Sequence, residues 1–491
     1  MNRKILIILC LIIPYHFYGQ SGLPFSSNKQ LYVKGNSALI GNNIVSTKAN
    51  KPYNNNSIND ILKLKYIDID NDKNTFSSSQ ATLNIVEKKP KIKYAALYWS
   101  AIYKYDVGIT KTVKLKGRNS GLKKIVYEGN NKRSTDVNSV LFKTPKSEYI
   151  TITGQTIFDS FNEEGLFENI KPYVCYADVT TILQNSNHIN GDYTLANMKA
   201  TQGLISGGAS GGWLLYIIYE QENAKPKYFT TYNGFQDVFK KPVKIHFEDF
   251  KAPETGEIKT SLLIGALEGD QKFKTDNCAF LDYKNQKYIP LFNKLRPKLN
   301  FFNSSISINE NLYTKRLPNS QNTLGFDLLK IEIPNKNNSI ISHNTNNATV
   351  QFKSKADRFY LFFVAFETEI NPIFLEGKEN QKSILVLNQD SKLDVDKDLE
   401  KIKTLKSISI PSVKKGYYLV SNVFSVKENA NKWIAFLKDK GHQPKSYLNP
   451  KNGWTYIYLN SDLNPDVIYQ ERKEISKFEY FKNIWILKIN L

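Results

Sequence analysis

Short hydrophobic and aromatic runs, separated by polar turn formers, dominate the chain from about residue 30 to residue 368. Runs of β-branched and aromatic residues bounded by Gly, Asn, Asp and Ser are typical of β-strands. Helical patterns do not alternate with them, so we predict an antiparallel β-sandwich region, as one elaborated domain or as two that divide near residues 207–212. The predicted strands include residues 94–103, 110–115, 149–153, 213–219, 261–266, 348–352 and 359–366.

The pattern changes at residue 416, where a strand-like run, 416–424, is followed by a helical one. Ser425 and Glu428 have the spacing of a capping box, which begins a helix. Gly441 then marks its end. The apolar stripe of this helix is expected to contain Ala430, Trp433, Ile434 and Leu437, which recur at helical spacing.

A predicted hairpin follows, with strands at residues 445–448 and 454–459 around a turn rich in Pro, Asn and Gly. Side chains alternate along a strand, so Trp454, Tyr456 and Tyr458 share one face and leave the aliphatic face for the helices. Asn464 and Pro465 begin a second helix, and residues 483–490 form a last strand. We expect a small βαβ-βαβ module whose aromatic face has no obvious internal cover.

The module resembles a SPOR domain, a family of peptidoglycan-binding domains. The resemblance covers roughly the last 80 residues and rests on a strand that ends in Phe424, on Glu428-Asn429-Ala430, on Lys440-Gly441 and on Asn452-Gly453-Trp454-x-Tyr456. It implies an α+β RNP-like fold that binds glycan strands lacking stem peptides along the open face of its sheet. The residues that it implies for this groove are Val420, Asn422, Trp454 and Tyr456.

The chain departs from the family pattern in its first strand. A polar residue is common in the family where Val420 stands, and a small polar one where Val423 stands. Aromatic rings can stack on the C–H patches of sugars, but aromatic residues in strands also serve as core or as cross-strand pairs. Both interpretations of Trp454 and Tyr456 stay open.

The N-terminus has the layout of a cleaved signal peptide, residues 1–20. Asn2-Arg3-Lys4 is positively charged, and the apolar run 5–13 is too short to span a bilayer. Cys10 lies inside that run without the small residues expected before a lipoprotein cysteine; a retained anchor is the alternative. We expect an exported protein of the periplasm or outer cell envelope, with no transmembrane segment after cleavage.

Composition changes this picture in two ways. The net charge of +21 would ordinarily suggest nucleic acid, but export removes that partner, and the lysines form no dense stripe. Anionic envelope polymers, lipid head groups or solubility explain the charge equally well. Beyond the signal peptide only Cys175 and Cys278 remain, which could pair in an oxidising compartment or stay as two buried thiols.

Several motifs recur in order along the β-rich region, at residues 94–100 (YAALYWS), 173–179 (YVCYADV), 211–213, 219–220, 233–235, 268–270, 301–304 and 322–327. In these motifs the region resembles the amino-terminal β domain of large surface proteins and gliding-type adhesins of Bacteroidetes. Such domains usually precede repeats and a type IX secretion sorting domain, whereas this chain ends in the SPOR-like module. The resemblance implies a partner in the outer membrane or the gliding machinery.

Catalytic motifs do not emerge from the sequence. The five histidines stand far apart without an H-E-x-x-H pattern, and Ser206 and Ser210 lack a nucleophile elbow. We therefore expect no enzyme and no cofactor, although paired carboxylates placed by the fold stay an alternative. Two acidic runs are weak calcium candidates because their oxygens alternate: Asp68, Asp70 and Asp72, and Asp394, Asp396, Asp398 and Glu400.

Together these patterns predict four segments: the signal peptide, a β-sandwich region at 21–370, a charged linker at 371–412 and the SPOR-like domain at 413–491. The expected function is envelope anchoring through peptidoglycan, with the β region presenting a surface to another envelope component. The alternative is a surface adhesin or carbohydrate-binding protein in which the β region does the binding.

Overall fold

The computed structural model describes residues 22–87, 90–114, 123–372, 374–375, 399, 401–481 and 483–491. The expected signal peptide and the acidic run from Asp394 to Glu400 lie outside these residues, apart from Leu399. The described chain is mostly antiparallel β-structure, which confirms the β-rich prediction.

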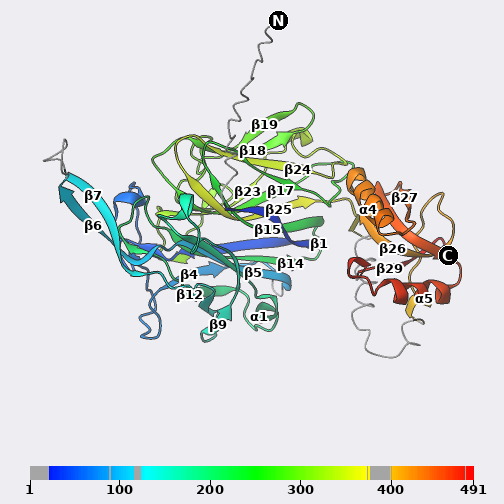
Figure 1. Cartoon of the computed structure of the whole chain (residues 1–491), viewed down its shortest axis with the longest axis horizontal. Helices are drawn as coiled ribbons and strands as arrows, with labels where there is room; N and C mark the ends of the chain where they lie inside the picture. The colour runs from blue at the N-terminus through cyan, green and yellow to red at the C-terminus, as the bar shows by residue number, and fades with distance from the viewer. Residues whose placement is uncertain are drawn as a thin grey trace, which may run out of the picture.

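One large sheet organises the β region (Figure 1). Its eleven strands run in the order β10-β11-β5-β14-β1-β15-β25-β17-β23-β20-β21. The bounds are β1 Gly22–Asn43, β5 Lys91–Ile102, β10 Gln155–Asp159, β11 Pro172–Asp178, β14 Gly211–Glu220, β15 Pro226–Val238, β17 Thr260–Gly269, β20 Ile306–Ile308, β21 Asn311–Leu312, β23 Gly325–Glu332 and β25 Phe359–Glu369.

Smaller sheets flank this large one, with β18, β19 and β24 on one side in Figure 1 and β4, β9 and β12 on the other. The first has the order β16-β24-β18-β19 and the second β22-β4-β12-β8-β9. Their bounds are β4 Ser78–Leu83, β8 Ser139–Lys143, β9 Ile150–Thr153, β12 Gly191–Ala196, β16 Val243–Phe247, β18 Asp276–Asp282, β19 Lys287–Leu291, β22 Arg316–Leu317 and β24 Ala348–Ser354.

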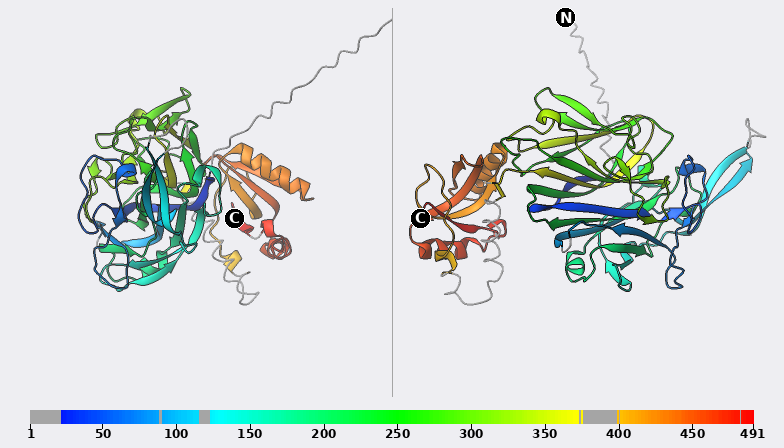
Figure 2. Two further views of the ribbon diagram at one scale, coloured as in Figure 1. Left: turned by 60° about the vertical axis from the view of Figure 1, so that its left-hand side comes forward. Right: turned by 180° about the vertical axis from the view of Figure 1, so that it is seen from behind.

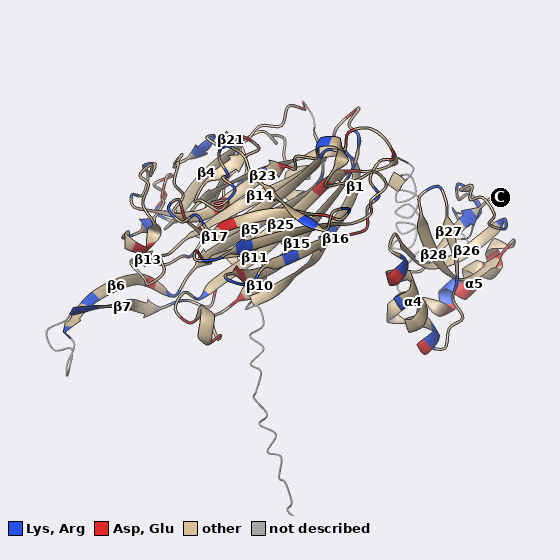
Figure 3. Ribbon diagram, turned by 90° about the horizontal axis from the view of Figure 1, so that it is seen from above, with Lys and Arg blue, Asp and Glu red and all other residues tan. Residues whose placement is uncertain are grey.

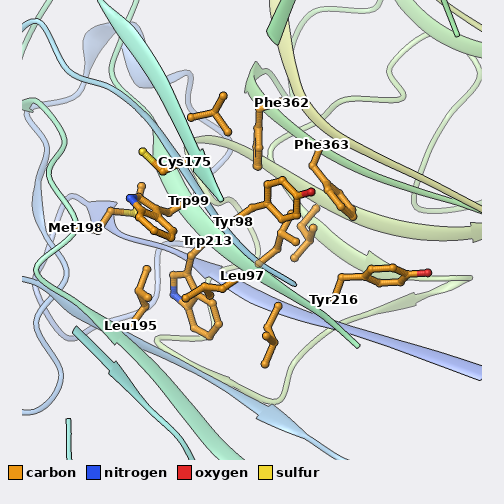
Figure 4. Packing of buried hydrophobic residues seen from close by; sticks show 14 of the residues in the cluster. Leu97, Tyr98, Trp99, Cys175, Leu195, Met198, Trp213, Tyr216, Phe362 and Phe363 are labelled. Carbon is orange, nitrogen blue, oxygen red and sulfur yellow. The ribbon is translucent and has the colours of Figure 1, made fainter. Parts of the chain in front are cut away.

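The core fills both faces of the large sheet (Figure 4). Tyr98 on β5 packs against Phe363 on β25 at 4.9 Å between ring centroids, although three strands, β14, β1 and β15, lie between β5 and β25 in the sheet order. On the neighbouring β14, Trp213 donates its indole N–H to the Ser79 hydroxyl of β4 at 2.9 Å. The large sheet therefore packs on part of itself as well as on the smaller sheets.

The glycine-rich stretch at 207–212 does not separate two sheets. β14, which follows it, pairs with β5 on one side and β1 on the other, and β1 continues the same sheet to β15. The two halves of the β region consequently share hydrogen bonds across the sheet.

A long hairpin leaves the body of the β region at one end (Figures 1 and 2). It consists of β6 (Tyr105–Lys114) and β7 (Lys123–Lys132), and short β13 (Gln202–Gly203) pairs with the base of β6. Val113, Ile125 and Tyr127 on this hairpin are exposed.

The C-terminal module, residues 416–491, has the predicted order of strands and helices. It contains β26 (Gly416–Phe424), α4 (Lys427–Asp439), β27 (Lys445–Asn449), β28 (Trp454–Asp462), α5 (Pro465–Ile475) and β29 (Trp485–Ile489). Its sheet has the order β27-β28-β26-β29, and α4 and α5 lie on one face of it (Figure 2).

One helix cap was predicted wrongly and the other correctly. The residue before α4 is Val426, whose extended backbone moves the helix start one residue beyond the Ser425 capping box, and no side chain caps the helix. Asn464 does cap α5, with its side-chain oxygen accepting the Asp466 N–H at 3.0 Å. Among the helices whose bounds are described, the others are α1 (Thr180–Gln184) and single 3-10 turns.

Candidate functional site

The aromatic face of the module sheet is the surface on which sequence reasoning placed a ligand. On β28, Ile457 packs among helix residues, whereas Trp454 and Tyr456 belong to the cluster on the opposite face. This separation follows the period-2 alternation of a strand and confirms the predicted division of β28 into two faces.

A bulge in β26 changes which of its residues reach that face. The pairing with β28 shifts on both sides of Val420, so that Val420 lies opposite Tyr458 and Asn422 opposite Ile457. Residues opposite each other in antiparallel strands point to the same side. Val420 therefore shares the aromatic face as expected, but Asn422 is on the helix side, and Val423 stands opposite Tyr456 instead. The predicted placement of Asn422 in the groove is wrong for this reason.

The predicted groove residues on the aromatic face are covered. Val420 is fully buried, and Trp454 and Tyr456 are each 3% exposed. The Phe374 ring lies edge-on to Trp454, with 4.0 Å between centroids and 82° between planes. Phe374 in turn contacts Tyr32 of β1 at 5.5 Å, so a chain of rings connects the module to the core of the β region. The expectation that this face lacks internal cover does not hold.

The last strand, β29, has buried side chains on both faces. Trp485 and Leu487 lie on the aromatic face, whereas Ile484 and Ile486 pack beside the helices, and all four are buried. Because both faces of this sheet are packed, both sets of side chains leave solvent.

Polar contacts accompany the apolar contact between the module and the β region. The Asn346 carboxamide donates to the main-chain carbonyl of Ser425 at 2.8 Å. At the start of α4, the Asn429 carboxamide donates to the Glu248 carboxylate at 3.1 Å. Docking is thus fixed by hydrogen bonds on either side of the β26–α4 junction as well as by rings.

One end of the aromatic face stays open to solvent. Tyr447 and Tyr458 are half-buried there, and Tyr418 packs against both rings at 5.8 and 5.0 Å. Burial raises the pKa of Tyr418 and of Tyr458, so both phenols stay protonated at neutral pH. The Tyr418 hydroxyl donates to the main-chain carbonyl of Lys414 at 2.6 Å.

A hollow of about 500 Å³ adjoins these tyrosines. Two lysines supply positive charge at its rim, and Ser461 and Asp462 supply acceptors, a mixture suited to a polar ligand with flat apolar patches. Period-2 alternation already placed Tyr458 on this face, but the lysines were missed because they precede the first strand. The hollow is lined by Lys414, Lys415, Tyr418, Ser461, Asp462 and Leu463.

Charge elsewhere is distributed rather than concentrated. Figure 3 shows Lys and Arg interspersed with Asp and Glu over both the β region and the module. This matches the scattered lysines of the sequence and singles out no basic stripe on the described surface.

The first calcium candidate is a loop whose acidic side chains bond within the chain. Asp70 accepts hydrogen bonds from the Asp72 N–H and from the hydroxyls of Thr75 and Tyr149. Asp68 accepts one from the Ser78 hydroxyl at 3.0 Å. Across the described residues, no three His, Cys, Asp or Glu side chains are grouped so that they could hold a metal ion.

Cys175 and Cys278 are both buried, as free thiols, in two different clusters of the core. Of the two alternatives that the sequence left open, the structure shows the unpaired one.

Comparisons with known proteins add little to this geometry. No protein-family model and no curated protein matches the chain. One solved structure, titled "Structure of PNGF-II in P21 space group", is similar at 11% identity and a TM-score of 0.19, covering 67% of this chain and 65% of its own. Another, of the Sulfolobus Turreted Icosahedral Virus, gives 10% identity and a TM-score of 0.13, covering 72% and 86%.

Such low TM-scores carry no argument about fold or function. A search of the described helices for a membrane span also finds none of sufficient length and apolar character.

Proposed function

We propose that this chain is an exported cell-envelope protein that binds peptidoglycan glycan strands through its C-terminal module, while its β region presents an interaction surface. The proposal is for binding rather than catalysis. Its sequence support is the resemblance of residues 413–491 to SPOR domains. Its structural support is the sheet β27-β28-β26-β29, which has helices on one face and aromatic side chains on the other.

The observation that carries the proposal is the open end of the aromatic face. Tyr458, which is half-buried, offers ring surface to the C–H patches of a sugar, and the buried Tyr418 ring supports it at 5.0 Å. The adjoining hollow offers Lys414 and Lys415 to acetamido and lactyl oxygens. A hollow of about 500 Å³ is of the size that takes one or two sugar rings.

The covered part of the face takes part only if the module moves. With Phe374 against Trp454, a glycan strand reaches the tyrosine end and stops there. Release of the module would expose Trp454 and Tyr456 and extend the groove along the sheet. Binding to long strands would then compete with docking.

The experiment is co-sedimentation of the full-length protein with purified sacculi. Tyr458→Ala and the double variant Lys414→Ser/Lys415→Ser are each expected to weaken binding several-fold. Tyr127→Ala, which removes an exposed tyrosine of the β6–β7 hairpin, is the matched control and should bind as the unaltered protein does. Equal binding by all four proteins, or no binding by any, would reject the proposal.

The second candidate is an adhesin or carbohydrate-binding protein in which the β region contacts the partner. The observation that favours it is the β6–β7 hairpin, which projects from the body and exposes Val113, Ile125 and Tyr127 (Figure 1). Cleavage of this hairpin by protease added to intact cells would favour surface display, whereas protection until the outer membrane is opened would favour the periplasmic function.

A further inference from the structure

Three buried oxygen atoms at one end of the β region have no hydrogen-bond partner among the described residues. They are Oδ2 of Asp276, Oδ2 of Asp357 and Oδ1 of Asn300. The three residues are 0%, 6% and 6% exposed. All three atoms are acceptors, and burying an unsatisfied acceptor costs free energy, so the group as a whole needs a donor or a cation.

Main-chain contacts bring the three residues together from distant parts of the sequence. Asp276, the first residue of β18, forms a parallel bridge with Asn300. Asp357 lies in the turn between β24 and β25, where its N–H donates to the hydroxyl of Thr275, the neighbour of Asp276, at 3.0 Å. The three side chains therefore start from adjacent backbone positions.

The hydrogen bonds that these side chains do make leave the acceptors free. The Phe302 N–H uses the other carboxylate oxygen of Asp276 at 2.8 Å. The Asn300 amide donates to the carbonyl of Gln271 at 2.9 Å, which fixes its amide group and leaves its oxygen without a partner among the described residues.

The surrounding charges are acidic. Burial and, to a smaller extent, the neighbouring Asp270 and Asp276 together raise the pKa of Asp357 to about 9. Burial likewise raises the pKa of Asp276 to about 7. The nearby Asp327 has its own counter-ion in Arg296, so that arginine does not neutralise the pair.

We propose that a hard divalent cation, of which calcium is the best fit, binds between Asp276, Asp357 and Asn300. Calcium takes carboxylate, carboxamide and main-chain oxygens together with water, and does not require three acidic side chains. Two carboxylates and one carboxamide, all presenting unsatisfied oxygens, form such a donor set. The site is separate from the loop of Asp68, Asp70 and Asp72, whose oxygens are engaged within the chain.

The position of the site indicates its role. The cation would connect the start of β18, the segment before Phe301 and the turn before β25. It would hold the flanking sheet β16-β24-β18-β19 against the large sheet, which contains β25.

The test uses the full-length protein after removal of divalent ions with a chelator. Calcium binding is measured by equilibrium dialysis, and thermal unfolding is followed with and without millimolar calcium. The unaltered protein is expected to bind calcium and to unfold at a higher temperature in its presence. Asp276→Asn should weaken this binding at least tenfold, whereas Asp70→Asn, in the other acidic loop, should leave it unchanged.

Asp357→Asn keeps the proposal testable if Asp276→Asn does not fold. Without calcium this variant should be about as stable as the unaltered protein, because the amide is uncharged like the carboxyl that burial keeps protonated. Added calcium should no longer stabilise it. Absence of calcium binding by the unaltered protein would overturn the proposal and assign protons or a water molecule to these oxygens. Loss of binding in Asp70→Asn with retention in Asp276→Asn and Asp357→Asn would overturn it as well.

Discussion

Phe374 lies edge-on against Trp454 with 4.0 Å between ring centroids, and this contact closes the aromatic face of the C-terminal module. Phe374 belongs to the segment that follows β25, the last strand of the large sheet, whereas Trp454 begins β28 of the module. Trp454, which the sequence suggested as a glycan-binding residue, therefore packs against another residue of the same chain.

Phe374→Ala is expected to loosen this docking. Truncating a buried phenylalanine typically costs about 3–5 kcal/mol, and here that loss falls on the contact between module and β region. Oxidative footprinting should show Trp454, now 3% exposed, becoming readily modified. Phe76→Ala, which alters an exposed phenylalanine of the β region, should leave Trp454 protected. If Trp454 stays protected in Phe374→Ala, contacts other than the Phe374 ring are sufficient to keep the module docked on the β region.

The same variant tests whether the covered face binds glycan. Under the proposed function, Phe374→Ala should bind sacculi more tightly than the unaltered protein, because docking no longer competes. Adding Trp454→Ala to Phe374→Ala should remove that gain. If Phe374→Ala exposes Trp454 yet binds no better, the covered face is a docking surface only and binding is confined to the tyrosine end.

Strand-like runs, the helical spacing of apolar residues and turn chemistry were sufficient to predict the strands and helices of the module, because each signal is local. The bulge in β26 was not predictable: Ser421 and Asn422 are both small and polar, so nothing in the pattern marks the extra residue. Nor could alternation reveal that Phe374 covers Trp454, since 79 residues intervene and the aromatic face would look the same if it were open.

The proposed cation site of Asp276, Asp357 and Asn300 could not be predicted from the sequence either. Asp276 begins β18 and Asp357 lies in the turn after β24, and the pairing of β18 with β24 brings them near each other. The acidic run from Asp68 to Asp72 is recognisable in the sequence, but its carboxylate oxygens accept hydrogen bonds from nearby residues of the same loop. Sequence spacing finds loops of this second kind and misses clusters assembled by a sheet.

The buried ion pair of Arg296 and Asp327 should be essential for folding of the β region. Both side chains are fully buried, and the guanidinium also donates to the carbonyls of Phe301 and Ser305. Arg296→Met leaves a buried carboxylate without its counter-ion, which typically costs about 3–5 kcal/mol. Urea unfolding should show this loss. The exposed pair of Lys477 and Glu474 is the control, and Lys477→Met should change stability by less than about 1 kcal/mol.

The two cysteines are expected to stay reduced and unreactive in the folded protein. Cys175 and Cys278 are fully buried, and burial raises the pKa of Cys175 to about 12 and that of Cys278 well above its ordinary value. Thiolate is the reactive form, so a maleimide should label neither residue under native conditions and both in denaturant. Failure to label either residue in denaturant without reductant would mean that they pair after all.

Glu268 should make the metal-free protein less stable as the pH rises. Its carboxyl is buried, which raises its pKa to about 8, and it accepts hydrogen bonds from Ser210 and Asn59. A carboxyl with a raised pKa holds its proton in the folded state but loses it in the unfolded state above about pH 4.3. Its contribution to stability is therefore complete below that pH and is lost as the pH rises towards 8.

Urea unfolding between pH 5 and pH 9, in chelator, measures this loss. A difference of one bound proton between the folded and unfolded states changes the free energy of unfolding by about 1.4 kcal/mol per pH unit. Glu268→Gln should reduce the pH dependence of this free energy by up to that amount, because the amide does not titrate. Asp282→Asn is the control: hydrogen bonds from Asn285 lower the pKa of Asp282, so its contribution changes only in acid. An identical slope in Glu268→Gln and the unaltered protein would mean that Glu268 is ionised in the folded state.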